Sequence, residues 1–167
     1  MRLIFIWSIV YSILYADIDF EKNRLEQAWE YLNKNKTQKA IEIYESLSKD
    51  NVGEVYYNLG MIYGFGINHI KKDNKLAIKY LEQARNLHHK KAPYFLSMLY
   101  ANMLDRNETK IMMLIIESAS DGYDEAELMI GKIFLDQNKT DNAKQWFEKA
   151  SKQGNVKAKE FLKQLKN

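Results

Sequence analysis

Residues 126–154, AELMIGKIFLDQNKTDNAKQWFEKASKQG, decide the fold, because small, aliphatic and aromatic residues recur there at helical spacing. Ala126-x3-Ile130-Gly131-x2-Phe134 makes a first pattern, and Ala143-x2-Trp146-x3-Ala150-x3-Gly154 makes a second. Spacings of three and four residues place such side chains on one face of a helix. The stretch therefore predicts two helices joined by a short turn.

The first of these patterns recurs along the chain, which indicates an internal repeat. Ala92-x3-Leu96-Ser97-x2-Tyr100 precedes it by 34 residues, Val55-x3-Leu59-Gly60-x2-Tyr63 comes 37 residues earlier still, and Ala158-x3-Leu162 begins a last half-unit. Repeats of this length are typical of solenoids, in which each unit buries its apolar face against its neighbours. We therefore expect an all-α fold, an α/α solenoid of about four helical hairpins plus a C-terminal capping helix.

Small residues inside the predicted helices indicate where helices cross. Glycine within a helix costs about 1 kcal/mol relative to alanine, and a close helix crossing at Gly60, Ser97 and Gly131 offsets that cost. Gly122 and Gly154 follow helices and suit the left-handed residue of a C-terminal cap. The aromatic residues Trp146, Tyr63 and Tyr100 are expected in the core, where Trp146→Ala should cost roughly 3–5 kcal/mol.

Several of these motifs together resemble a known repeat family. Leu59-Gly60-x2-Tyr63, Gly66, Asp73-x2-Leu76-Ala77-x2-Tyr80 and Trp146-x3-Ala150-x3-Gly154 are similar to the Sel-one-like repeat, a relative of the tetratricopeptide repeat. This resemblance covers about residues 53–166, and residues 23–50 resemble the tetratricopeptide form. It implies one tetratricopeptide-like and three Sel-one-like units, at about 23–50, 53–88, 91–122 and 125–154, with a cap at 155–167.

The N-terminal residues 1–16 are predicted to be a secretory signal peptide, followed by a linker at 17–22. Arg2 precedes an apolar run from Leu3 to Ala16, which would rise about 21 Å as a helix and so fall short of the roughly 30 Å hydrocarbon core. Cleavage after Ala16 is expected, with an uncleaved membrane anchor as the alternative. The Lys-, Asn- and Ile-rich composition is typical of low-GC bacteria, so the predicted destination is the periplasm.

Composition and charge exclude several classes of function. The chain has no cysteine, which excludes disulfides, thiolate metal sites and thiol nucleophiles. Its 25 Lys and Arg against 22 Asp and Glu give a balance too even for a dedicated nucleic-acid binder. His88 and His89 are adjacent, do not have the spacing of a helical metal pair, and are expected to be solvated in a loop. We expect no metal and no cofactor.

One short motif has the spacing found in a class of hydrolases. Ser46-Leu47-Ser48-Lys49 contains the Ser-x-x-Lys of β-lactam enzymes, but the companion Ser-Asp-Asn and Lys-Thr-Gly motifs are missing. Roughly one such match is expected by chance, given the serine and lysine content. We therefore predict that the protein is not an enzyme, and an enzyme acting on β-lactams or peptidoglycan is the weakest of the alternatives.

The family resemblance implies assembly or adaptor work. We expect a non-catalytic periplasmic scaffold or adaptor in a cell-envelope assembly, whose partner is another envelope or periplasmic protein. A chaperone-like or regulatory adaptor for an exported protein is the alternative. Nucleic acid and a stable membrane span after signal cleavage are not expected, and the sequence leaves the oligomeric state open.

A groove along the first helices is the predicted binding site. In tetratricopeptide-like solenoids the first helix of each unit lines the concave face, and residues three before and one after the small crossing residue project from it. These residues are Leu25, Trp29, Tyr57, Met61, Tyr94, Met98, Leu128 and Lys132. Exposed apolar stripes mark binding sites, and we predict Trp29, Tyr57 and Tyr94 as anchors. Alternatively, adjacent first helices bury part of the stripe between them.

Two segments carry a possible modification signal. Asp105-Arg106-Asn107-Glu108-Thr109 and Asp136-Gln137-Asn138-Lys139-Thr140 resemble the extended acceptor of bacterial N-linked oligosaccharyltransferases, where about 0.12 matches are expected by chance from the composition. We therefore predict glycosylation at Asn107 and Asn138. The alternative is turn chemistry, because Asp, Asn and Thr also favour loops and helix N-caps.

Overall fold

The computed structural model describes residues 20, 22–48 and 52–165, so the predicted signal peptide at 1–16 lies outside the described residues. Within this part of the chain, all regular structure is helical. The helices in chain order are a helix over residues 22–33, then α2 (Thr37–Leu47), α3 (Gly53–Phe65), the short 3-10 helix η2 (Ile67–His69), α4 (Asn74–Asn86), α5 (Ala92–Ala101), α6 (Glu108–Ser120), α7 (Asp124–Asp136), α8 (Thr140–Lys152) and α9 (Val156–Gln164).

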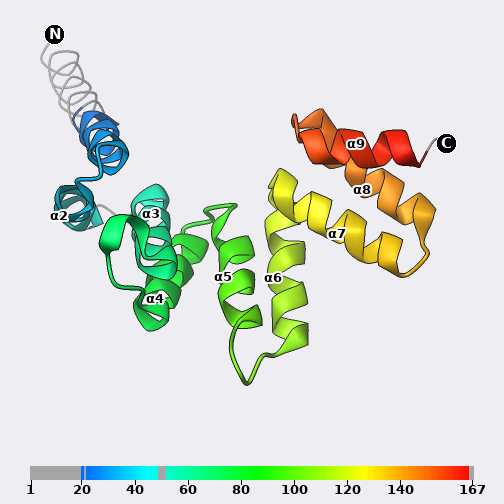
Figure 1. Ribbon diagram of the computed structural model, residues 1–167, viewed down its shortest axis with the longest axis horizontal. Coiled ribbons are helices and arrows are strands. Elements are labelled where there is room, and N and C mark those ends of the chain that lie inside the picture. Colours follow the sequence, from blue (N-terminus) through cyan, green and yellow to red (C-terminus); the bar gives the residue numbers. More distant parts are fainter. Residues whose placement is uncertain (1–19, 21, 49–51, 166–167) are drawn as a thin grey trace, which may run out of the picture.

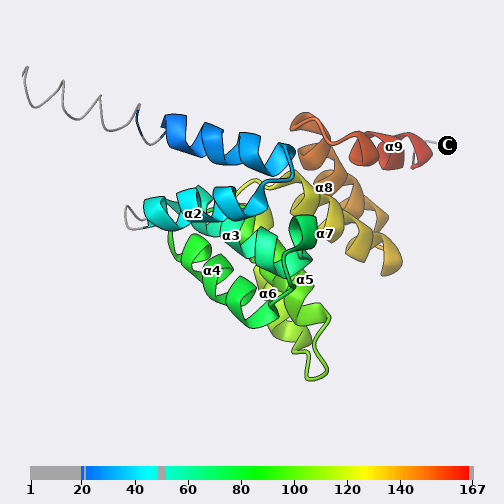
Figure 2. The same ribbon diagram turned by 60° about the vertical axis from the view of Figure 1, so that its left-hand side comes forward.

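The helices form antiparallel hairpins that stack side by side, with α2 at one end of the long axis and α9 at the other (Figure 1). Helices α3 and α4, α5 and α6, and α7 and α8 pair within hairpins, and each hairpin packs on the next through α4 with α5 and α6 with α7. Figure 2 shows the helix over residues 22–33 running beside α2, with α9 at the other end of the molecule. The predicted α/α solenoid is confirmed, with α9 packed on α8 as its last helix. None of the described helices is long and apolar enough to cross a bilayer.

The close crossings predicted at glycine are present in two hairpins. A Cβ atom on Gly60 of α3 would lie 2.6 Å from Cγ of Leu81 in α4, far inside van der Waals contact. A Cβ atom on Gly131 of α7 would overlap the ring of Phe147 in α8. Because Gly60 and Gly131 have no side chain, the two helices of each of these two hairpins can approach closely. This approach buries Leu81 and Phe147 completely.

The turns between helices close with one repeated hydrogen bond. At five helix ends, an N–H donates to the carbonyl five residues earlier, and the residue before that N–H has a positive φ, as in a Schellman cap. Gly122 and Gly154 hold this left-handed position, as predicted, with φ of 75° and 100°. The other three positions are filled by Asn35, His88 and Asn138. The caps satisfy helix carbonyls and turn the chain sharply into the next helix.

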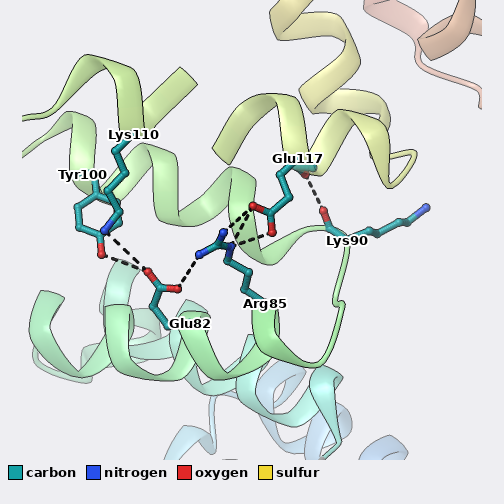
Figure 3. A network of polar contacts seen from close by, with 7 residues as sticks. Glu82, Arg85, Lys90, Tyr100, Lys110 and Glu117 are labelled. Carbon is teal, nitrogen blue, oxygen red and sulfur yellow. Dashed lines mark hydrogen bonds and ion pairs between the residues drawn. The ribbon is translucent and has the colours of Figure 1, made fainter. Parts of the chain in front are cut away.

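A polar network fastens the hairpin of α3 and α4 to the hairpin of α5 and α6 (Figure 3). The Arg85 guanidinium of α4 donates to both carboxylate oxygens of Glu117 in α6, from Nε at 2.7 Å and from Nη2 at 2.8 Å, and its Nη1 donates to Glu82 at 3.2 Å. The Tyr100 hydroxyl of α5 also donates to Glu82, and the Lys110 ammonium lies 3.8 Å from the centroid of the Tyr100 ring. The hydrogen bonds to Glu117 raise the pKa of Arg85 above its ordinary value, so the guanidinium stays charged.

The aromatic residue at the centre of the last hairpin differs by one position from the prediction. Phe147, and not Trp146, is fully buried, because the buried stripe of α8 runs through Ala143, Phe147 and Ala150 at helical spacing. Trp146 is half-buried, packs against the preceding core cluster and has the Lys149 ammonium 4.0 Å from its ring centroid. Tyr63 and Tyr100 are likewise half-buried at the edges of core clusters.

This packing predicts the order of two truncations. Phe147→Ala should lower the free energy of unfolding by about 3–5 kcal/mol, because it leaves a cavity over Gly131. Trp146→Ala should cost less, because part of its ring is already in solvent. Denaturant unfolding of the two variants measures both values, and a larger loss for Trp146→Ala would contradict this arrangement of α7 and α8.

Candidate functional site

The predicted groove residues divide into an exposed and a buried set. Trp29 and Met98 are exposed, and Leu25, Met61, Tyr94 and Lys132 are partly exposed. Tyr57 and Leu128 retain only 8% and 3% of their exposure, so these two belong to the core and not to an open stripe. The expectation of a continuous exposed stripe is therefore corrected at Tyr57 and Leu128.

The two residues are buried because consecutive first helices touch at their position. The Tyr57 ring of α3 lies 5.6 Å from the Phe95 ring of α5, measured between centroids. Leu128 of α7 belongs to the same core cluster as Ala158 of α9. Tyr94 is the equivalent residue of α5, and its ring lies 5.3 Å from that of Tyr123, which precedes α7. The alternative in which neighbouring first helices cover part of the stripe is thus the observed arrangement.

These contacts join into one aromatic cluster centred on Phe95. Its ring contacts those of Tyr57, Phe65, Tyr94 and Tyr123, at centroid distances of 5.6, 6.1, 5.5 and 6.4 Å. Phe65 stands at the open edge of the cluster with 50% of its surface exposed. Burial raises the pKa of Tyr123 to about 12 and moves that of Tyr57 higher still, so both phenols stay neutral and the cluster presents an uncharged surface.

Sequence reasoning missed three members of the cluster, Phe65, Phe95 and Tyr123. Phe65 could have been found, because it follows Met61 by four residues on the same helical face. Phe95 and Tyr123 gave no such signal. Phe95 adjoins a predicted groove residue, and Tyr123 lies in the turn before α7, so their meeting depends on how the hairpins stack.

His89 also belongs to this region, which corrects its expected role as a solvated loop residue. Its ring stacks on Tyr57 at a centroid distance of 4.3 Å and is largely buried, and its Nε2 donates to Oε2 of Glu54 at 2.9 Å. The cause is the cap at the end of α4, where His88 takes the left-handed position and remains exposed, while His89 turns back toward the start of α3. The last hairpin has an equivalent contact, in which the residue after the left-handed Gly154 again contacts the start of the first helix. Nδ2 of Asn155 donates to Asp124 of α7 there.

The remaining candidates for chemistry have ordinary structural surroundings. The Ser46 hydroxyl donates to the carbonyl of Ile43 in its own helix and accepts from Arg24, and Lys49 lies outside the described residues. Across the described ranges, no three His, Asp or Glu residues gather closely enough to hold a metal ion.

Both predicted acceptor asparagines are exposed, and both take part in the turns. Asn107 is the N-cap of α6, where its side-chain oxygen accepts from the Lys110 N–H at 2.9 Å. Asn138 occupies the left-handed position after α7 with φ of 59°. The alternative role in turn formation is therefore present at both sites.

Two repeat models match the chain at the hairpins just described. The Sel1 repeat matches residues 53–89, which run from the start of α3 to His89, and a tetratricopeptide repeat matches residues 125–152 in α7 and α8. The chain thus contains one hairpin that matches the Sel1 repeat and one that matches a tetratricopeptide repeat. The tetratricopeptide match falls on a hairpin expected to be Sel-one-like, and the connections differ accordingly: three residues join α7 to α8, whereas α3 and α4 are joined through Gly66 and η2.

Solved structures with this repeat architecture resemble the chain. The Sel1 repeat protein from Oxalobacter formigenes superposes with a TM-score of 0.73 at 20% identity, over 88% of this chain and 62% of that one. A protective antigen of uropathogenic Escherichia coli strains gives 0.72 at 19%, over 85% and 32%. An immunity protein from Pseudomonas aeruginosa gives 0.61 at 18%, over 83% and 59%. The repeat protein thus spans less than two thirds of each of these relatives, and no curated protein sequence matches it.

The contact between His89 and Glu54 predicts a pH effect in this Sel1-type hairpin. The hydrogen bond from His89 lowers the pKa of Glu54 from its ordinary 4.5, so the folded protein binds that proton less readily than the unfolded chain does. The contact therefore stabilises the fold above the ordinary pKa, and this stabilisation is lost as the pH falls below it. Because half of Glu54 is exposed, we expect it to contribute no more than about 1 kcal/mol.

Denaturant unfolding at about pH 7 and about pH 3.5 tests this effect. Glu54→Gln should lose less stability between the two pH values than the wild type does. Glu148→Gln, on the exposed face of α8, is the matched control and should respond as the wild type does. An identical pH response of Glu54→Gln and the wild type would contradict the proposed contact.

Proposed function

We propose that this chain is a non-catalytic scaffold or adaptor that binds a segment of a partner protein on the first-helix side of its hairpins. The supporting observation is the aromatic cluster, in which the half-exposed ring of Phe65 packs against the partly buried Phe95, and Phe95 in turn packs against the buried Tyr57. A ring fixed in this way loses little conformational entropy on binding, and aromatic residues and methionine are enriched at the centres of interfaces.

The binding surface that we propose is the exposed part of the expected groove, extended by Phe65. Met61 precedes Phe65 by about one turn of α3 and is partly exposed, and Met98 is exposed about one turn beyond Phe95 in α5. Trp29 offers a further exposed ring on the helix over residues 22–33. Tyr57 and Leu128 are buried and therefore lie outside this surface, although Tyr57 supports it through its contact with Phe95.

We further propose that the protein acts in the periplasm as part of a cell-envelope assembly. The apolar run from Leu3 to Ala16 and the expected cleavage before Asp17 support export. N-terminal sequencing of the protein from its native host, after separation of periplasm and membranes, tests the proposal. A mature chain that begins at Asp17 supports it, whereas an intact N-terminus in the cytoplasmic fraction would contradict it.

Binding is predicted to depend on Phe65 more than on any exposed apolar residue outside the surface. Once proximity labelling in the periplasm has identified a partner, Phe65→Ala should weaken its binding by about thirtyfold, the effect expected of a true anchor. Val156→Ala on α9 removes a similarly exposed apolar side chain and serves as the control. Equal dissociation constants for Phe65→Ala and the wild type would refute the assignment of the surface, while an unchanged melting temperature would confirm that the fold is intact.

Glycosylation at Asn107 and Asn138 is a separate proposal, supported by their exposure in turns and by the preceding acids Asp105 and Asp136. In a host that has the transferase, mass spectrometry should find both peptides carrying a glycan. Thr109→Ala should remove the modification from Asn107 and leave that at Asn138. Asn35 lacks the preceding acid and should remain bare. Unmodified Asn107 and Asn138 peptides from the native host would end the proposal.

A further inference from the structure

The three described hairpins that begin at α3, α5 and α7 allow a position-by-position comparison of their second helices. Helices α4, α6 and α8 each have 13 residues. They also bury the same three positions, which shows that they are in register. These positions are Ala77, Leu81 and Ala84 in α4, Ile111, Ile115 and Ser118 in α6, and Ala143, Phe147 and Ala150 in α8.

On the opposite face, α6 differs from its two equivalents. Four positions of this face, spaced by four, three and four residues, form a largely exposed stripe. They are mostly charged in α4 (Lys75, Lys79, Glu82 and Asn86) and in α8 (Asp141, Gln145, Glu148 and Lys152). In α6 the same positions carry no charge, and we name them the α6 seam: Thr109, Met113, Ile116 and Ser120. Met113 and Ile116 are 65% and 47% exposed.

The α6 seam has the geometry of a helix-pairing surface. Its 4-3-4 spacing is that of the contact positions in a two-helix coiled coil. A hollow of about 520 Å³ lies beside it, lined by Met113 and Ile116 of the seam and by Leu114, Arg85 and Glu117 among others. Such a hollow can receive an apolar side chain from an opposing helix.

Charges beside the α6 seam favour an antiparallel copy of the same helix. A helix turns about 100° per residue, so Lys110 near the start of α6 and Asp121 at its end fall on the same flank of the seam, and Glu108 on the other. When two such helices pack antiparallel about a two-fold axis, identical flanks meet with their ends reversed. Lys110 of each copy then faces Asp121 of the other, whereas a parallel pair brings opposite flanks together and separates Lys110 from Asp121 by the length of the helix.

We propose that two copies of this chain associate through their α6 seams, antiparallel and about a two-fold axis. Met113 of one copy packs against Ile116 of the other, with Thr109 opposite Ser120 at the ends of the contact. A helix of 13 residues is about 20 Å long and offers less than a standard interface. The dimer is therefore weak and forms in a concentration-dependent way.

Analytical ultracentrifugation of the full chain, expressed with its N-terminal segment so that the host processes it, measures the association. The variant Met113→Lys with Ile116→Glu introduces the residues that α4 carries at these positions, so it should fold normally and dimerise at least tenfold more weakly. Gln145→Lys makes a similar change on α8 and should leave the dimer unaffected. At a protein concentration of about 1 mM, even a dimer with a dissociation constant of about 1 mM would be half formed. A wild-type protein that remains monomeric at that concentration would overturn the proposal.

Charge reversal tests the antiparallel arrangement. Asp121→Lys and Lys110→Glu should each weaken association at least tenfold, and the two together should restore it. Because Lys110 also contacts Tyr100 and Glu82, recovery in the double variant is the decisive result: a damaged fold would not recover. Failure of the double variant to recover would overturn the antiparallel geometry.

Cross-linking gives an independent readout, because the chain has no cysteine of its own. Met113→Cys, treated with a short bis-maleimide reagent, should give a covalent dimer, whereas Gln145→Cys at the equivalent position of α8 should remain monomeric. Equal cross-linking of the two variants would overturn the proposal. The proposal would also be overturned if the wild-type protein is monomeric and variants of the α6 seam lose binding to a different protein. The seam would then be the binding site for that partner.

Discussion

The stack of hairpins depends on the close approach of two helices inside the hairpins of α3 and α4 and of α7 and α8. At Gly60 and Gly131 this approach leaves no room for a Cβ atom. Because the second helix lies so near, Leu81 and Phe147 are buried from solvent. The residues on the outside of each hairpin then lie close enough to contact the next hairpin. The ion pair between Arg85 and Glu117 and the ring contacts of Phe95 both form across these inter-hairpin distances. A wider crossing would weaken all of them together.

The crossing points could be predicted from the sequence, because glycine destabilises a helix interior unless a neighbouring helix fills the space of the missing side chain. The burial of Phe147 in place of Trp146 could not be predicted. The two aromatic residues are neighbours in sequence, and either one lies three or four residues from both Ala143 and Ala150, as a buried helical position requires. The burial of Tyr57 and Leu128 depends on the distance between successive first helices, and no local pattern encodes that distance. The same limit applies to His89, whose partner Glu54 lies 35 residues away in sequence.

The two faces of the molecule differ in how their apolar residues are supported. On the first-helix side, Phe65 packs against the ring of Phe95, which in turn contacts the core residue Tyr57. On the second-helix side, Met113 and Ile116 lie on α6 at positions where α4 and α8 carry charged or polar residues. A rigid aromatic surface and a flexible methionine-containing one suit different kinds of contact. The molecule can therefore use one side without occupying the other.

The described contacts run mainly between helices that follow one another along the chain. Folding then requires little long-range loop closure, and the low contact order favours rapid folding from any hairpin outward. The same arrangement has an evolutionary consequence. Duplication or loss of one hairpin would leave the interfaces between the others unchanged, so the length of such a stack can grow or shrink in single steps while the surfaces it carries are retained.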